Sequence, residues 1–170
     1  MPSDGPDRRL VMTSAALVQA ASDAEFTIAR ALFVEYADQL GVDLCFQGFA
    51  AELDTLAQMY GPPGGCLILA QQAGEYVGCI GVRRLSAEVC EMKRLYVRTT
   101  VRGGGLGRRL AQAAIDAAQG IGYQRMVLDT LASMAAARVL YATLGFRPIA
   151  AYYKNPMPGV MYMALELGSR

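Results

Sequence analysis

Four glycines among the five residues 103–107 constrain the fold of this chain more than any other feature of its sequence. The stretch before them, 88–97, contains the Val, Cys, Leu and Tyr residues typical of a strand. In the stretch after them, 106–121, apolar residues recur at helical spacing. The chain must therefore turn from a strand into a helix through a corner made of glycine.

Such a corner is suited to binding an anion. Glycines carry no Cβ, so their main-chain N–H groups can approach a phosphate closely, and the start of the following helix adds about half a positive charge. Arg102, together with Arg108 or Arg109, could donate further hydrogen bonds to the same phosphates. We therefore expect a phosphate-bearing ligand at this corner.

The common nucleotide motifs do not fit this segment. A P-loop requires Lys-Ser or Lys-Thr after its last glycine, and no such pair follows a glycine here. The dinucleotide pattern GxGxxG fails because Arg108 or Leu110 stands where its last glycine would be. A tight turn that binds no ligand remains the alternative interpretation.

The rest of the chain predicts an α/β domain. A capping box at Ser22 to Glu25 begins a helix that ends at Gly41, and Ser133 is the expected N-cap of a later helix. The predicted order is strand, two helices, three strands, helix, strand, helix and two strands, which suits a mixed, mostly antiparallel sheet of about seven strands with helices on both faces. The strands are expected at 15–20, 66–71, 76–85, 88–97, 126–131, 146–153 and 160–167, and the later helices at 49–60, 106–121 and 134–144.

Length and composition set limits on function. The 170 residues suit one domain, which we place at 11–170 after a flexible tail at 1–10. A net charge of +1 argues against nucleic acid or an anionic membrane as a partner. The absence of histidine excludes histidine triads and histidine metal ligands, and the four cysteines form no CxxC pair, so we expect no metal and four reduced core thiols. No apolar run is long enough to span a bilayer, and we expect a cytoplasmic protein.

Two motifs together resemble a known family. Arg102-x-x-Gly105-x-Gly107 is similar to the [RQ]xxGxG[GA] signature of the GNAT superfamily of acetyl-CoA-dependent N-acetyltransferases, and Leu140 to Phe146 is similar to its LYxxxGF stretch. The motifs occur in the family order, and the elements agree from about residue 15 to 167. The resemblance implies a single GNAT-like domain in which two neighbouring strands splay into a V that holds the pantetheine arm of acetyl-CoA.

The resemblance also implies a set of cofactor-binding residues. The main chain of one strand end would contact the pantetheine, the glycine corner would wrap the pyrophosphate, and Ser133 stands where the family often has a polar residue that contacts the cofactor or the acceptor. Helix capping is the alternative role for Ser133. The residues assigned to the cofactor are Leu95, Tyr96, Val97, Arg102, Gly103, Gly104, Gly105, Leu106, Gly107, Arg108 and Ser133.

Acetyl transfer also needs an acid, a base and a donor to the oxyanion. Tyr141 matches the family tyrosine that protonates the departing thiolate; because Val139, Leu140 and Leu144 would fill the core face of its helix, we expect Tyr141 to point elsewhere. Glu91, whose pKa partial burial would raise, is the candidate base, with a salt bridge to Lys93 or a water relay as alternatives. The resemblance places the oxyanion near the Leu95 amide, and Cys90 is discounted as a nucleophile because no histidine can activate it.

The function expected from this resemblance is acetyl transfer from acetyl-CoA to a primary amine of a small molecule or peptide, by direct attack in a ternary complex. A non-catalytic acyl-CoA-binding or sensor module with the same fold is the alternative. The segment 152–156 could border the acceptor pocket or be a plain hairpin loop, and Arg83, Arg84, Lys93 and Lys154 suggest a locally basic mouth. Similar proteins are frequently homodimers, although nothing in this sequence locates an interface.

Overall fold

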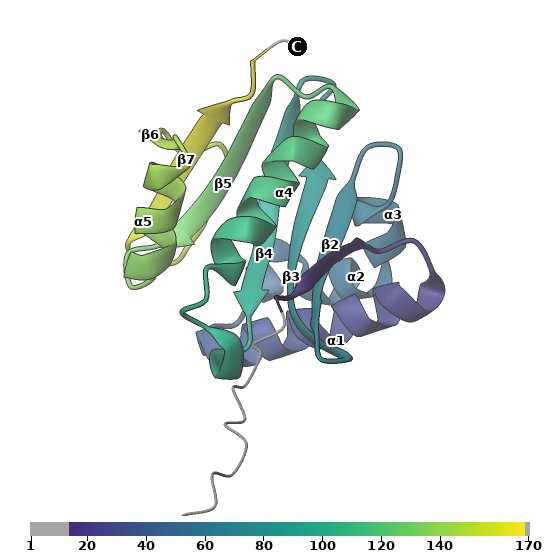
Figure 1. Cartoon of the computed structure of the whole chain (residues 1–170). Helices are drawn as coiled ribbons and strands as arrows, with labels where there is room; N and C mark the ends of the chain where they lie inside the picture. Colours follow the sequence, from purple (N-terminus) through teal and green to yellow (C-terminus); the bar gives the residue numbers. More distant parts are fainter. Residues whose placement is uncertain (1–13, 169–170) are drawn as a thin grey trace, which may run out of the picture.

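The computed structural model describes residues 14–168, except for the side chain of Phe46, and shows one twisted seven-stranded sheet between two layers of helices (Figure 1). The sheet order is β1-β2-β3-β4-β5-β7-β6, with β4 and β5 parallel and every other neighbouring pair antiparallel. This confirms the predicted fold class. The strands are β1 Ala16–Gln19, β2 Cys66–Gln72, β3 Glu75–Arg84, β4 Val89–Val97, β5 Arg125–Leu131, β6 Arg147–Ile149 and β7 Val160–Glu166; the helices are α1 Asp23–Leu40, α2 Phe49–Asp54, α3 Leu56–Tyr60, α4 Leu106–Ile121 and α5 Ala135–Thr143, with 3-10 turns η1 Cys45–Gln47 and η2 Thr99–Val101.

Each face of the sheet has its own hydrophobic core. On one face, α4 and α5 pack on β2 to β5 around buried residues such as Leu110 and Met126. On the other face, α1 and α3 pack on β2 and β3 around Phe33, Tyr60 and Leu67. Figure 1 shows α4 lying across one face of the sheet and α1, α2 and α3 on the opposite face. Helices on both faces leave only the strand ends and their loops free for a site.

Local sequence signals account for most element boundaries. The predicted capping box is present at the start of α1, where the Ser22 hydroxyl accepts from the Glu25 N–H and the Glu25 carboxylate accepts from the Ser22 N–H. Gly41 ends that helix with a φ of 65°, in the left-handed region that glycine tolerates. A side chain at Gly81 would lie 2.5 Å from the Tyr60 ring, so a glycine is needed there for α3 to pack on β3.

Four predictions need correction. The expected helix 49–60 breaks into α2 and α3 because Thr55 leaves helical geometry, with φ −130°. The strand expected at 146–153 is only β6, whose pairing with β7 ends at Ile149. Ser133 is not a helix cap, since α5 begins after Met134 without a side-chain cap in the described structure, and Cys45 is exposed while the other three cysteines are buried. The tail predicted at 1–10 lies outside the described residues.

Two irregularities open the middle of the sheet. The parallel ladder between β4 and β5 runs only from Val89–Arg125 to Glu91–Val127. In the β3–β4 ladder, Cys79 pairs with Tyr96 and Gly81 with Lys93, so a bulge of one extra residue lies in β4 at Arg94 and Leu95. Arg94 has a φ of 60°, which is costly for a residue with a side chain. β4 thus diverges from β5 beyond Glu91, which gives the V-shaped splay that the resemblance predicts.

Candidate functional site

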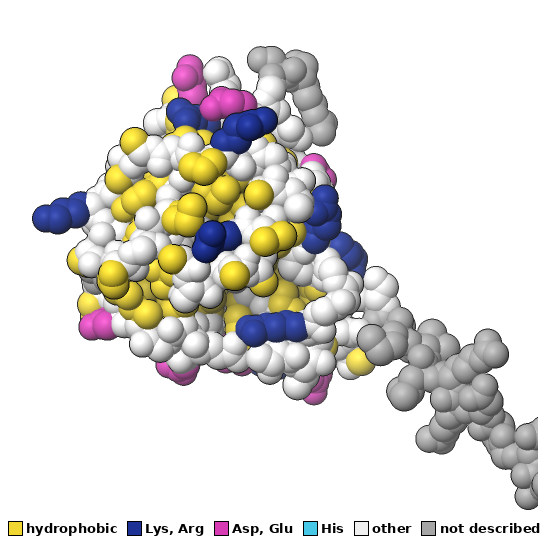
Figure 2. All heavy atoms as spheres, turned by 90° about the vertical axis from the view of Figure 1, so that its left-hand side faces the viewer, with side chains coloured by type: hydrophobic (Ala, Val, Ile, Leu, Met, Phe, Trp, Pro, Cys, Tyr) yellow, Lys and Arg dark blue, Asp and Glu magenta, His cyan; other side chains and the backbone are white. Residues whose placement is uncertain are grey.

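A groove of about 740 Å³ runs along the outer end of the splay. Its walls are formed by Leu95 to Val97 of β4, the corner before α4, the end of α1 and the first residues of α5. Figure 2, which views the molecule from the side where α5 lies in Figure 1, shows a surface hollowed over hydrophobic side chains, with a basic side chain beside the hollow. The groove is large enough for a cofactor-sized ligand.

The glycine corner is open on its outer side. Gly103 and Gly105 have φ of 90° and 77°, which glycine adopts without strain, and a Cβ added at Gly103, Gly104 or Gly105 would meet no described atom within 4 Å. No described side chain caps the start of α4, so its first N–H groups are free for a ligand. Protein does not fill the position proposed for a pyrophosphate.

The structure brings nearly all the predicted cofactor residues together. Every residue of that set lines the groove except Gly104, which lies in the same corner but is not part of the lining. Ser133 is exposed on the α5 side of the groove. The Arg102 guanidinium donates to the Val97 carbonyl at 2.8 Å and to the Gln39 amide oxygen at 2.9 Å, so it braces the corner against β4 and α1.

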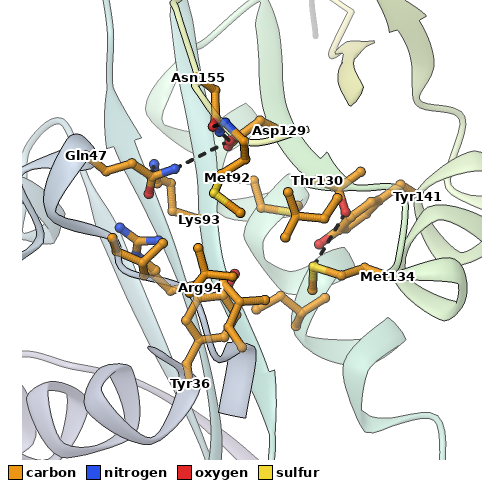
Figure 3. A pocket seen from close by; sticks show the side chains of 16 residues that line it. Tyr36, Gln47, Met92, Lys93, Arg94, Asp129, Thr130, Met134, Tyr141 and Asn155 are labelled. Atoms are coloured by element: carbon orange, nitrogen blue, oxygen red, sulfur yellow. Dashed lines mark hydrogen bonds between the residues drawn. The ribbon is translucent and has the colours of Figure 1, made fainter. Parts of the chain in front are cut away.

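A second, smaller pocket of about 50 Å³ lies at the inner end of the splay (Figure 3). It shares Tyr36, Leu40, Leu95 and Met134 with the groove, so the two cavities adjoin. Its other lining residues come from η1 and the loop before it, β4, β5, α5 and the loop between β6 and β7; they are Val42, Leu44, Gln47, Met92, Lys93, Arg94, Asp129, Thr130, Leu131, Tyr141, Asn155 and Met157. Asn155 places the 152–156 segment at this pocket.

Tyr141 lies at the β5 side of this pocket, beside Thr130 and Met134 (Figure 3). Its side chain is 7% exposed, and burial raises the pKa of its hydroxyl well above the usual value near 10. The hydroxyl therefore keeps its proton at neutral pH. The predicted helix phase was wrong for two residues, because Val139 is 65% exposed and Tyr141 is the buried residue of α5. Leu140 and Leu144 do pack against the core, as expected.

Glu91 is buried beneath the pocket and is not part of the described lining. Its Oε1 accepts from Arg83 at 2.8 Å and lies 3.4 Å from the Lys93 ammonium, and its Oε2 accepts from the Tyr152 hydroxyl at 2.8 Å. The salt bridge to Lys93 that the sequence suggested is thus present. Both carboxylate oxygens are already engaged by side chains of the chain itself.

A polar chain of three residues crosses the pocket wall. The Gln47 amide nitrogen lies 3.5 Å from Asp129 Oδ2, and the Gln47 amide oxygen accepts from Lys93 Nζ at 3.3 Å. Asp129 Oδ2 also accepts from the Tyr153 hydroxyl at 2.5 Å and from the Asn155 amide at 3.0 Å. Among the described residues, the hydrogen-bond donors to this carboxylate, Gln47, Tyr153 and Asn155, are neutral. Burial lowers the pKa of the Lys93 ammonium, and the charge of Glu91 opposes that shift.

Sequence reasoning missed Asp129 and Gln47. Asp129 could have been found, since it is the one charged residue in the strand 126–131, whose other residues are apolar apart from Thr130. A charged side chain in a buried strand needs a partner or has a function. No feature of the sequence marks Gln47, because its position depends on how the loop after α1 folds over the sheet.

The bulge is fixed by a buried ion pair. Arg94 donates from Nη2 to Glu52 Oε2 at 2.6 Å and from Nε to Oε1 at 3.2 Å, and its guanidinium lies over the Tyr36 and Phe49 rings. The Tyr60 hydroxyl also donates to Glu52. Arg94 and Glu52 are both almost fully buried, at 5% and 2% exposure. This pair ties α2 to the strained residue of β4 at the pocket.

Burial opposes ionisation of the thiols of Cys66 and Cys90. Burial raises the pKa of Cys66 to about 11 and that of Cys90 to about 12, so both stay protonated at neutral pH. The described residues contain no cluster of three or more His, Cys, Asp or Glu side chains that could hold a metal ion. Within the same residues, 14–168, no helix is both long and apolar enough to cross a membrane.

Comparison with known proteins places the chain in a family. The profile of the acetyltransferase (GNAT) family matches residues 29–146. An uncharacterized N-acetyltransferase of Schizosaccharomyces pombe, C1271.07c, is 41% identical over 140 residues, which cover 81% of this chain and 86% of that protein. The human N-acetylaspartate synthetase is 34% identical over 110 residues, covering 64% of this chain and 35% of that protein, so this chain matches about a third of its length.

Solved structures share the fold. An acetyltransferase from Streptococcus agalactiae superposes with a TM-score of 0.74 at 17% identity, covering 91% of this chain and 99% of that one. The structure of yncA from Salmonella typhimurium, solved with its cofactor acetyl-CoA, gives a TM-score of 0.66 at 20% identity, covering 93% and 96%. The splayed sheet, the open glycine corner and the family match agree with one another: the chain belongs to the GNAT family of acetyltransferases, as its motifs predict.

Proposed function

We propose that this protein transfers an acetyl group from acetyl-CoA to a primary amine of a small molecule or peptide, by direct attack in a ternary complex. The observation that carries the proposal is that the groove beside the glycine corner adjoins the polar pocket, with Leu95 and Met134 lining both. A thioester held along the groove would present its carbonyl at the junction, where an amine in the pocket can reach it.

The cofactor arm is expected to lie along β4. Beyond Glu91 the ladder with β5 has ended, so the β4 main chain near Leu95 would hydrogen-bond an extended ligand as a strand would, while the Val97 carbonyl already accepts from Arg102. The amides of Gly103 to Arg108 at the start of α4 would hold the pyrophosphate. The Leu95 amide, next to the bulge, is our candidate donor to the oxyanion.

Tyr141 is the proposed acid. The sulfur leaves the tetrahedral intermediate more readily when it is protonated, and a thiol has a pKa near 8.5, so a neutral hydroxyl in the adjoining pocket can supply the proton. Burial keeps the Tyr141 hydroxyl in this protonated form.

The amine must lose a proton as well. Glu91 lies behind Lys93 and Tyr152, so a proton from the pocket reaches it only through those side chains or through water. The relatives named N-acetylaspartate synthetase support an acceptor that carries both an amine and a carboxylate.

The test measures acetyl-CoA binding and CoA release separately. Acetyl-CoA should raise the melting temperature, and at least one amine should cause stoichiometric release of CoA and formation of an amide. The non-catalytic alternative predicts the first result without the second for every amine tried. Loss of the thioester is best followed by its absorbance rather than with a thiol reagent, because Cys45 is exposed and would react.

A further inference from the structure

The inference concerns the acceptor and rests on the proposed function. We propose that the acceptor is an α-amino acid, whose carboxylate binds Lys93 and whose amine binds Asp129, with Asp129 receiving the amine proton.

The first support is the charge of the pocket wall. Arg94 lines the pocket, but its charge is already matched by the bidentate contact with Glu52. The charges of Lys93 and Asp129 are not matched in this way. Among the described residues, no cation lies within 4 Å of the Asp129 carboxylate, and Lys93 shares its partner Glu91 with Arg83. The pocket therefore presents one cation with surplus charge and one carboxylate that lacks a cationic partner.

The second support is the way Gln47 connects these two groups. Its amide nitrogen lies 3.0 Å from the Tyr153 hydroxyl and 3.5 Å from Asp129 Oδ2, and its amide oxygen accepts from Lys93 at 3.3 Å (Figure 3). The nitrogen and oxygen of an amide are about 2.2 Å apart, and the amino nitrogen and the nearer carboxylate oxygen of an α-amino acid are about 2.7 Å apart or more, from standard bond lengths. An α-amino acid thus offers a donor and an acceptor of the kinds that Gln47 offers, at a somewhat larger spacing and with full charges.

The third support is the position of Asp129 relative to Tyr141. Both line the same small pocket, which adjoins the cofactor groove. An amine bound to Asp129 would lie in the same pocket as the acid that serves the leaving group. Glu91 then has a positioning role, since it holds Lys93 from behind through the 3.4 Å contact.

The proposed reaction balances as follows. The bound ammonium gives one proton to the Asp129 carboxylate, and the resulting amine attacks the thioester carbonyl, forming the C–N bond. Collapse of the intermediate breaks the C–S bond, and Tyr141 protonates the thiolate. The nitrogen loses its second proton, which replaces the one that Tyr141 gave, and the proton on Asp129 passes to solvent, so one proton is released per turnover.

The experiment compares amino acids with the amines that lack only the carboxylate. Pairs such as leucine and 3-methylbutylamine, or methionine and 3-(methylthio)propylamine, are assayed for loss of the thioester of acetyl-CoA. The amino acid should have a kcat/KM roughly 10- to 100-fold higher than its partner, the size expected for one hydrogen-bonded charge contact. Equal or better use of the decarboxylated amines would overturn this inference and leave the proposed function intact, whereas no turnover with either class would overturn both.

Two variants separate the roles of the two side chains. Lys93→Met should raise KM for amino acids roughly 10- to 100-fold and leave that for the decarboxylated amines within about twofold; Lys154→Met, which removes an exposed lysine near the pocket, is the matched control. Asp129→Asn should lower kcat by roughly 100-fold or more at neutral pH. That defect should shrink as pH rises, because the free amine then forms in solution. Both variants must still bind acetyl-CoA, and a loss that is the same for both acceptor classes or at every pH contradicts the assignment.

Discussion

Replacing Arg94 by Met tests whether the buried ion pair holds the bulge in place. The side chain keeps much of its volume and the residue keeps the same positive φ, so the variant mainly removes the charge that faces Glu52. Glu52 is 2% exposed and would retain only the Tyr60 hydroxyl and the more distant Lys93 charge. Removing one partner of a buried ion pair lowers the unfolding free energy by about 3–5 kcal/mol, because the other charge stays buried without a partner. For a domain of this size, that loss lowers Tm by roughly 6–20 °C.

The chain contains a matched control for this experiment. Arg98 and Glu35 form a pair with the same 2.6 Å contact between Nη2 and a carboxylate oxygen, but each of their side chains is 36% exposed. Arg98→Met should therefore cost no more than about 1 kcal/mol. The assay is thermal and urea unfolding of both variants beside the parent. Equal losses from the two substitutions would refute the reasoning, because burial is the difference between the pairs.

A double variant examines the cause of the loss. Adding Glu52→Gln to Arg94→Met removes the unpaired charge while leaving an amide oxygen for the Tyr60 hydroxyl. The double variant should therefore be more stable than Arg94→Met by at least about 2 kcal/mol in unfolding free energy. Burial acts to raise the pKa of Glu52, but the contacts with Arg94 outweigh it and hold the pKa below its usual value. The pair therefore stabilises the fold above about pH 4.3 and loses this effect as pH falls further. The difference in unfolding free energy between the parent and Arg94→Met should therefore become smaller as pH falls below that value.

Three further variants address the proposed mechanism. Tyr141→Phe should lower kcat by roughly 100-fold and leave acetyl-CoA affinity within about twofold, by titration and steady-state kinetics; unchanged kcat would remove Tyr141 from the reaction. Gly105→Ala should weaken acetyl-CoA binding roughly tenfold or more, because the strained corner no longer presents its amides, whereas Gly74→Ala, at a similar positive φ in the open β2–β3 turn, should cost similar stability but leave binding alone. Glu91→Gln should raise KM for a carboxylate-bearing acceptor more than it lowers kcat, and the opposite split would favour Glu91 as the base.

The fold was largely predictable because its signals are local. The capping box at Ser22, the end of α1 at Gly41 and the glycine corner before α4 each fix the backbone through residues a few positions apart. The cofactor groove follows from the same corner, since nine residues predicted from the motif and its neighbouring strand end line one cavity together with Ser133. Which residues of α5 are buried was not predictable in this way, because in a nine-residue helix at the edge of a sheet the buried face is decided by contacts with distant segments.

The acceptor pocket depends on contacts between segments far apart in the sequence. Gln47 meets Lys93 across 46 positions and Asp129 across 82. Nothing local in the sequence marks Arg94 as the residue of a bulge, because its positive φ is imposed by pairing with β3 and by Glu52 on another element. The bulge allows β4 to leave β5, and the groove and the smaller pocket adjoin in the gap between them. A change that relaxed Arg94 would therefore disturb the cofactor groove and the acceptor pocket together, although its side chain lines only the latter.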